Sequence, residues 1–192
     1  ATTRPNRGDS DLEVLWLAAA CLPLTPDADR LRTTSGRHNR EFVPVEVALS
    51  GGQWRRDNRQ GLTSHDAFPG AIIAPPGTAQ NHGLAFGAQL AWSGNHSQLV
   101  EAIDDGRSQW QLGEWLAPGE VRLTPGASLT SPEVLATCSI QGFGGVARNF
   151  HAAIRARSSW PGGAMRPRPV HLNTWEALYF AHDIAALKAL AD

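Results

Sequence analysis

Short apolar stretches alternate with turn-forming residues along most of the chain. The turns include Ser50-Gly51-Gly52, Pro75-Pro76-Gly77 and Asp104-Asp105-Gly106. In such turns Gly permits positive φ, Pro fixes φ, and Asp tolerates the left-handed region. Many short strands at this spacing predict an antiparallel β-sandwich. The expected strands cover residues 12–22, 42–49, 71–74, 82–92, 98–103, 109–112, 120–123 and 133–139, and residues 1–10 are expected to form a flexible start.

The pattern changes after residue 139. Apolar residues at Val146, Phe150, Ala153 and Ile154 recur at helical spacing and predict a helix over 146–157. A linker rich in Pro, Gly and Arg follows at 160–169, then a short apolar strand over 170–175 and a helical segment over 183–191. A strand, a loop and a helix form one βα unit of a parallel architecture, which cannot close a sheet alone. We therefore expect a second domain that is cut off soon after it begins.

Charge and hydropathy exclude several classes of function. The 17 basic and 18 acidic residues are spread along the chain and give a net charge of −1, which argues against nucleic-acid and anionic-membrane partners. No apolar run reaches the roughly 18 residues that a membrane span needs. The longest one, at 14–24, contains Pro23 and follows acidic residues, which favours a buried strand over a signal peptide. A cytoplasmic location is the resulting expectation.

Cysteine and tryptophan usage adds two expectations. Cys21 and Cys138 form neither a metal motif nor a disulfide framework. Both lie in apolar runs, which predicts buried thiols. Seven Trp against one Tyr is an unusual ratio. Trp faces bind sugar rings, but Trp also fills sandwich cores, so composition leaves both roles open.

The isolated catalytic motifs are weak. Gly142-Phe143-Gly144-Gly145-Val146-Ala147 matches the dinucleotide pattern G-x-G-x-x-A after a strand-like run, but the acidic residue expected about 20 positions later is missing. A tight entry into a helix is the competing interpretation. Gly8-Asp9-Ser10 is similar to an esterase nucleophile turn, yet no apolar strand precedes it.

Metal and acid–base chemistry are not marked by local spacing. The seven His form no short-spaced pair of the kind that converges on one ion. Glycoside hydrolysis needs two carboxyl groups, and nothing in the local sequence marks a pair among the candidates. These are Asp104, Asp105, Glu114, Glu120, Glu133, Glu176 and Asp183.

A collinear set of segments resembles one enzyme family. Residues 168–180, Arg-Pro-Val-His-Leu-Asn-Thr-Trp-Glu-Ala-Leu-Tyr-Phe, are similar to the start of the catalytic barrel in glycoside hydrolase family 36, the microbial α-galactosidases. Upstream, residues 61–69, 87–99, 116–120, 130–133 and 148–151 resemble further family segments in the same order. The resemblance covers about residues 42–192, and residues 1–41 match poorly.

The resemblance implies a fold and an activity. The chain would hold a partial, supersandwich-like β-sandwich at 1–139, a connecting helix and linker at 140–168, and the first strand and helix of a (β/α)₈ barrel at 169–192. The parent enzyme would hydrolyse terminal α-galactosides such as melibiose and raffinose with retention, using two Asp residues beyond Asp192. It would use no cofactor or metal and would often form tetramers. The chain alone would be inactive.

The same resemblance supplies the candidate site residues. Trp175 would stand at the carboxyl end of the first barrel strand, the face where barrel enzymes place their sites, and would offer its flat face to galactose. Asn173 and Glu176 belong to the same motif, either as sugar contacts or as residues that position the loop. The alternative function is a non-catalytic carbohydrate-binding sandwich, in which exposed Trp side chains hold the sugar.

Overall fold

The computed structural model describes residues 1–63, 66–158 and 167–191. They form two compact units, Ala1–Ala153 and Ile154–Asp192. In chain order the elements are β1 (Thr3–Pro5), β2 (Leu12–Glu13), β3 (Trp16–Leu24), β4 (Arg30–Arg37), β5 (Arg40–Ala48), β6 (Gly52–Asn58), β7 (Gly70–Ala74), β8 (Ala85–Ala91), β9 (His96–Ala102), β10 (Ser108–Trp115), β11 (Arg122–Leu123), β12 (Ser128–Thr130), β13 (Glu133–Ser139), α1 (Gly142–Arg157), α2 (Trp175–Leu178) and α3 (Ile184–Ala191).

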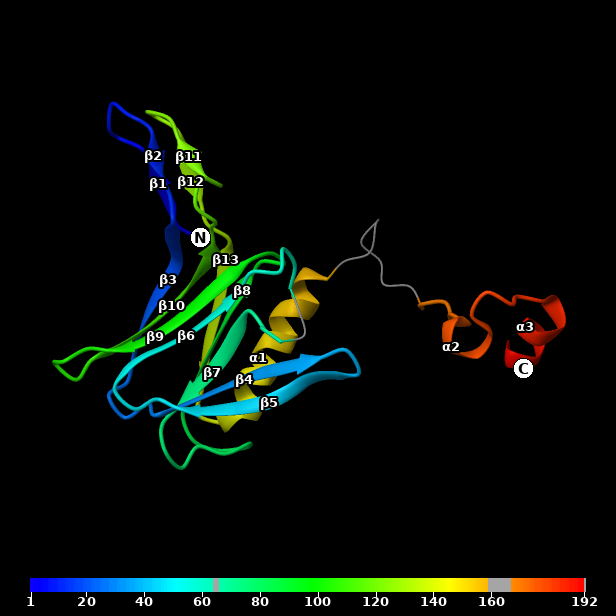
Figure 1. Cartoon of the computed structure of the whole chain (residues 1–192). Coiled ribbons are helices and arrows are strands. Elements are labelled where there is room, and N and C mark those ends of the chain that lie inside the picture. The colour runs from blue at the N-terminus through cyan, green and yellow to red at the C-terminus, as the bar shows by residue number, and fades with distance from the viewer. Residues whose placement is uncertain (64–65, 159–166, 192) are drawn as a thin grey trace. The chain divides into compact units, whose positions relative to one another are not determined.

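Two antiparallel sheets face each other in the first unit (Figure 1). One has four strands in the order β3-β10-β9-β6, and the other has five in the order β13-β8-β7-β4-β5. Their inner faces share one core, in which Leu31, Ile73, Trp110 and Leu112 are almost fully buried. Alternation along each strand sends these residues inward and their neighbours outward. The predicted antiparallel sandwich is therefore confirmed.

Helix α1 packs on the outer side of the five-stranded sheet. Val146 and Phe143 are buried against Ala74 and Ala85, and Phe150 adds to the same cluster. A side chain at Gly87 of β8 would collide with Val146 and Phe150. The absence of a side chain at Gly87 thus allows the helix to approach the sheet closely.

The first residues are ordered, so the expected flexible start is wrong. β1 pairs with β12 and β2 pairs with β11, and Figure 1 shows these two ribbons extending from the sandwich. Asn6 is buried and joins the ribbons, because its Nδ2 donates to the carbonyls of Ser10 and Leu123, both at 2.8 Å. The pairing partner lies more than a hundred residues away, which a local pattern does not reveal.

Several strand predictions need correction. The expected strand at 12–22 is two strands, since Val14 and Leu15 separate β2 from β3. β4 and β6 were not predicted at all. Their sequences are mostly polar, and in each of them one large apolar residue, Leu31 or Trp54, points to the core. The remaining expected strands overlap β5, β7, β8, β9, β10, β11 and β13, with shifted ends for all but β13.

The second unit contains α2 and α3 but no strand among its described residues. The strand expected at 170–175 is therefore wrong for this chain, and α2 already begins at Trp175. A strand is held by ladder hydrogen bonds to a neighbour, and the described part of this unit supplies no such neighbour. The helix expected at 183–191 is confirmed as α3.

The prediction of buried thiols is wrong, although both cysteines are free as expected. Cys21 lies opposite Gln111 on β10, and its thiol donates to Oε1 of Gln109 at 3.1 Å. Cys138 lies on the edge strand β13. Alternation along β3 directs Cys21 away from the core, and Cys138 is exposed at the edge of its sheet.

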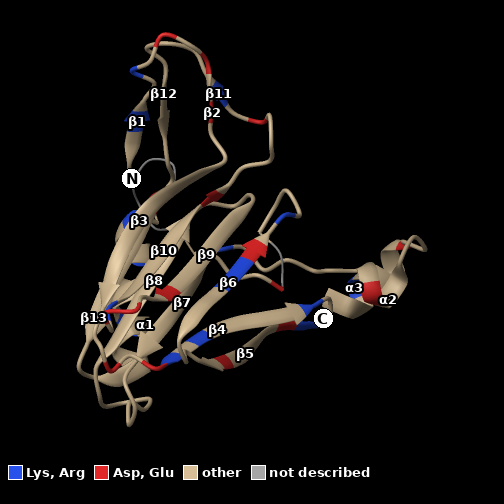
Figure 2. Cartoon of the chain, turned by 60° about the vertical axis from the view of Figure 1, so that its left-hand side comes forward, with Lys and Arg blue, Asp and Glu red and all other residues tan. Residues whose placement is uncertain are grey.

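Charge is distributed as the composition suggests. Figure 2 shows acidic and basic residues mixed over the elements without a large field of one sign. Several are paired, such as Arg32 with Glu46 and Arg107 with Asp105. Within the described residues, no helix has the length and apolar character of a membrane span.

Candidate functional site

The three candidate sugar-binding residues adjoin one another at the start of α2. Oδ1 of Asn173 accepts a hydrogen bond from the backbone N–H of Trp175 at 2.9 Å. The carbonyl of Thr174 accepts from the N–H groups of Ala177 and Leu178. Asn173 therefore fixes the backbone that carries Trp175, as a positioning residue would.

Trp175 is held by two aromatic neighbours while remaining open to solvent. Its ring centroid lies 5.4 Å from that of Tyr179 and 5.3 Å from that of Phe180, and both pairs are edge-to-face. Such contacts orient an indole ring. The side chain nevertheless remains 54% exposed, which leaves area for a ligand.

The carboxylates of the second unit have different surroundings. Glu176 lies exposed in the first turn of α2. Oδ1 of Asp183 accepts from the N–H groups of Ala185 and Ala186 at 2.9 and 3.0 Å, which makes Asp183 the N-cap of α3. Asp183 is thus occupied by a structural role, and Glu176 remains the candidate acceptor for a sugar hydroxyl.

In the first unit, the carboxyl group of Glu114 lies close to that of Glu120. Burial raises the pKa of Glu114, and the negative charge of Glu120 raises it further. Glu120 also accepts a hydrogen bond at 2.7 Å from the N–H of Ala117, which closes the turn between β10 and β11. This contact gives Glu120 a structural role in the turn.

Polar residues on β6 and β9 fix the loop that carries the family-like segment at 61–69. Nδ2 of Asn58 donates to the carbonyl of Leu62 at 2.7 Å, and its Oδ1 accepts from the N–H of Gln60. Oδ1 of Asn95 accepts from the N–H of Gly61 at 2.7 Å. Asn95, a motif position without a role in the sequence, is therefore a loop anchor; His65 lies outside the described residues.

Asp57 reinforces the same loop. Its carboxylate accepts hydrogen bonds from Ser97 at 2.6 Å, Arg55 at 2.9 Å and Arg59 at 2.7 Å. Burial alone would raise the pKa of Asp57, but the hydrogen bonds from these three partners outweigh it and leave the pKa lowered. The guanidinium of Arg59 also lies 4.6 Å from the ring centroid of Trp115.

His96 stands beside this network on β9. It is almost fully buried, and burial lowers its pKa against the opposing effect of hydrogen bonds with backbone groups of Gly94 and Ala67. His96 is therefore neutral at neutral pH. A neutral imidazole fits this buried position, because burying an unpaired charge would lower the stability of the fold.

The Gly142 motif is not a phosphate site. The first N–H groups of α1 already donate to carbonyls of this chain: Gly142 to Gly83, Phe143 to Ala79, Gly144 to Gln80. A phosphate would need those donors free. Gly142 has φ of 63°, and an added side chain there would overlap the loop at Ala79. The motif is thus a tight entry into a helix.

Two other candidate sites also have structural explanations. In the segment Gly8-Asp9-Ser10, Oδ1 of Asn6 accepts from the N–H of Gly8, which forms a side-chain-capped turn without the strand and helix of a nucleophile turn. Among the described residues no group of three or more His, Cys, Asp or Glu could hold a metal ion.

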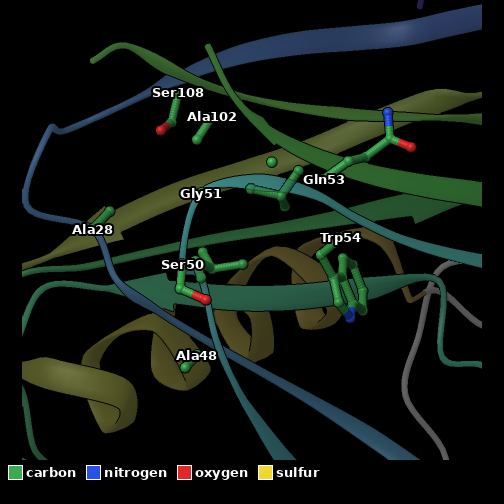
Figure 3. Close-up of a pocket in the computed structure, with 11 residues that line it drawn as sticks. Ala28, Ala48, Ser50, Gly51, Gln53, Trp54, Ala102 and Ser108 are labelled. Carbon is green, nitrogen blue, oxygen red and sulfur yellow. The ribbon is translucent and has the colours of Figure 1, made fainter. Parts of the chain in front are cut away.

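A cavity of about 200 Å³ lies at one end of the sandwich, near the turn between β5 and β6 (Figure 3). Small residues form most of its wall, and the larger ones are Leu49, Gln53, Trp54 and Val100. Figure 3 shows that the side chains of Trp54 and Gln53 point in opposite directions, as expected for neighbours on a strand. The sequence predicted the turn at Ser50-Gly51-Gly52, but it did not predict a cavity beside that turn.

Comparison with protein families assigns the chain. The model of the glycosyl hydrolase family 36 N-terminal domain matches residues 1–124. The chain belongs to glycosyl hydrolase family 36. The melibiase model matches residues 128–192, so the two matches together span almost all of the 192 residues of this chain.

Individual relatives agree with this assignment. An α-galactosidase of Escherichia coli is 35% identical over 91% of this chain. Alpha-galactosidase C of Emericella nidulans is 31% identical over 99% of it. The chain spans about a quarter of the length of these relatives, 24% and 25%.

Solved structures share the fold. A variant of the Geobacillus stearothermophilus family 36 α-galactosidase AgaA, in complex with stachyose, superposes with a TM-score of 0.86 at 26% identity, covering 98% of this chain and 26% of that one. The galactosidase domain of AgaSK gives 0.83 at 29% identity, with 93% and 25% covered. Another AgaA variant was solved with raffinose.

These matches correct one expectation about the N-terminus. Residues 1–41 were expected to match the family poorly, yet the N-terminal domain model matches from residue 1. The short strands β1 and β2 carry few apolar residues, so this segment has no strong sequence pattern. The domain match and the antiparallel pairing of β1 with β12 show that this segment is part of the sandwich unit.

Proposed function

We propose that this chain acts within an enzyme that hydrolyses terminal α-galactosides of the raffinose type. The observation that carries the proposal is the match of both family 36 models along nearly all of the chain. The relatives named above are α-galactosidases, and two of the similar structures hold stachyose and raffinose. The expected chemistry is a double displacement by two Asp residues beyond this chain, with a covalent galactosyl intermediate.

We further propose roles for three residues of this chain, which the geometry at α2 supports. Trp175 offers an oriented, half-exposed indole face on which the C–H side of galactose can stack. Asn173 fixes the backbone beneath Trp175. Glu176 is exposed next to it and can accept a hydrogen bond from a sugar hydroxyl.

The domain and assembly expectations belong to the same proposal. We assign the sandwich to 1–139, the connecting helix and linker to 140–168, and the beginning of the catalytic barrel to 169–192. We further propose that the intact enzyme is cytoplasmic and assembles into homotetramers. Sedimentation of the longer protein tests the last point, since a monomer would contradict it.

The test of the site uses the longer protein that carries this chain. Trp175→Ala should lower kcat/KM for a chromogenic α-galactoside by about 10- to 100-fold, which corresponds to roughly 1.4–2.7 kcal/mol of lost transition-state binding. Phe42→Ala, at an exposed aromatic residue of β5, is the matched control and should leave kcat/KM unchanged. Unchanged kcat/KM in Trp175→Ala would remove Trp175 from the sugar site.

A further inference from the structure

The cavity at the end of the sandwich is built by a row of small residues. Gly52 pairs with Ala102, and Ala102 pairs with Ser108, so three neighbouring strands place small residues side by side. Ala48, at the end of β5, and Ala28, in the turn between β3 and β4, complete the wall. Larger residues in these places would continue the core, so the sequence itself leaves this space open.

The base of the cavity is apolar and aromatic. Ala102 and Val100 are two residues apart on β9 and share the inward face of the sheet. Val100 is buried in the sandwich core, and Trp54 packs against the same core while also lining the cavity. Figure 3 shows the Trp54 side chain directed between the sheets. The cavity therefore presents an aromatic side chain to an occupant.

The entrance is polar. Ser50 and Gly51 form the turn at the mouth, and Ser108 lies on the wall. Gly51 and Gly52 both have positive φ, and no atom lies within 4 Å of where their side chains would begin, so the turn backbone is open to the surroundings. Hydroxyl and backbone groups thus stand at the mouth, above the Trp54 side chain.

We propose that this cavity, which is lined entirely by residues of the first unit, binds a single pyranose ring. A pyranose has an apolar C–H side for Trp54 and hydroxyl groups for the polar mouth. An apolar cavity of about 150 Å³ holds one benzene ring, so about 200 Å³ accommodates one substituted six-membered ring and no disaccharide. The occupant is thus a monosaccharide or the terminal unit of a longer sugar.

The test is a titration of the 192-residue chain with galactose, followed by ¹H–¹⁵N NMR of the tryptophan indole signals. Trp54→Phe identifies the Trp54 signal by its loss. Galactose should shift that signal with a Kd in the millimolar range, as expected for a small polar ligand. Ala102→Leu fills the cavity and should weaken binding about tenfold or more. Ala91→Leu, the same change at an exposed strand residue, should leave the Kd unchanged.

Ser108→Val is the second variant, because it narrows the cavity and removes a hydroxyl with a residue that strands favour. It should weaken galactose binding in the same direction as Ala102→Leu. The proposal would be overturned if galactose did not shift the Trp54 signal, or if both cavity variants bound galactose as tightly as the wild-type chain. It would also be overturned if the cavity bound cyclohexanol but not galactose. The result does not depend on hydrolysis, so an inactive longer protein would leave it standing.

Discussion

At the scale of single residues, polar side chains around the loop after β6 hold the backbone in place rather than perform chemistry. Asn58 and Asn95 anchor the loop after β6, and Asp57 gathers Ser97, Arg55 and Arg59 around one carboxylate. These contacts join β6 and β9 to residues that follow in the loop. These hydrogen bonds could not be predicted from the sequence, because an Asn or Asp within a strand pattern does not indicate which distant group it will bind.

The carboxylate of Asp57 should make stability depend on pH in one direction. Its pKa is lowered on folding, so its contribution is fully present above the unfolded value of 3.8 and is lost as the pH falls through the folded pKa. Asp57→Asn should therefore lower the free energy of unfolding by about 1–2 kcal/mol at neutral pH, because charged hydrogen bonds are lost at a partly screened site.

Chemical denaturation at pH 7 and at a pH below 3.8 measures this difference. The gap between the wild-type chain and Asp57→Asn should narrow at the lower pH. Asp104→Asn, in an exposed turn, serves as the control and should change stability by less than about 0.5 kcal/mol. A gap of equal size at both pH values would show that the Asp57 charge is not responsible.

At the scale of elements, the pattern of apolar stretches and turn residues located most of the strands. β13 was predicted with its observed ends, and β5, β7 and β8 were located within a few residues. β4 and β6 were missed because their sequences are polar and their neighbours in the sheet, β7 and β5 for β4 and β9 for β6, are distant from them or not evident in the local pattern. The opposite error occurred at 170–173, where a strand was predicted and none forms. An apolar run without a neighbouring strand has no partner for ladder hydrogen bonds.

The packing of α1 on β8 gives a prediction at this scale. Gly87→Ala places a methyl group where Val146 and Phe150 lie, so it should destabilise the chain by about 1–3 kcal/mol through overpacking. Val146→Ala makes room for that methyl group. In a double-mutant cycle measured by denaturation, the two changes together should cost less than the sum of the single changes. Strict additivity would show that helix and sheet do not meet at Gly87.

At the scale of the whole molecule, the order of weak motifs carried more information than any one of them. Residues 168–180 and the segments before them indicated family 36, and the family models confirm this from residue 1 onward. What the sequence could not provide was the surrounding geometry: that Gly142 opens a helix whose donors are occupied, and that Cys21 points outward. Those outcomes depend on partners distant in the chain.

The exposed apolar residues of the second unit predict self-association of the 192-residue chain. Val170, Phe180 and Ile184 are 99%, 85% and 73% exposed, which is unusual for large apolar side chains clustered in one segment. Sedimentation velocity should show an average mass that rises with concentration. Replacing these three residues by Ser should reduce that rise, whereas Ile140→Ser, 80% exposed in the first unit, should not. A monomer at all concentrations would contradict this prediction.

The central claim is that the chain belongs to a working α-galactosidase and supplies a part of it without the catalytic carboxylates. The most direct measurement compares hydrolysis of chromogenic α- and β-galactosides by the longer protein that carries this chain and by the 192-residue chain alone. We predict that the longer protein cleaves the α-anomer selectively and that the chain alone cleaves neither. Robust turnover by the chain alone, or preference of the longer protein for the β-anomer, would contradict the account.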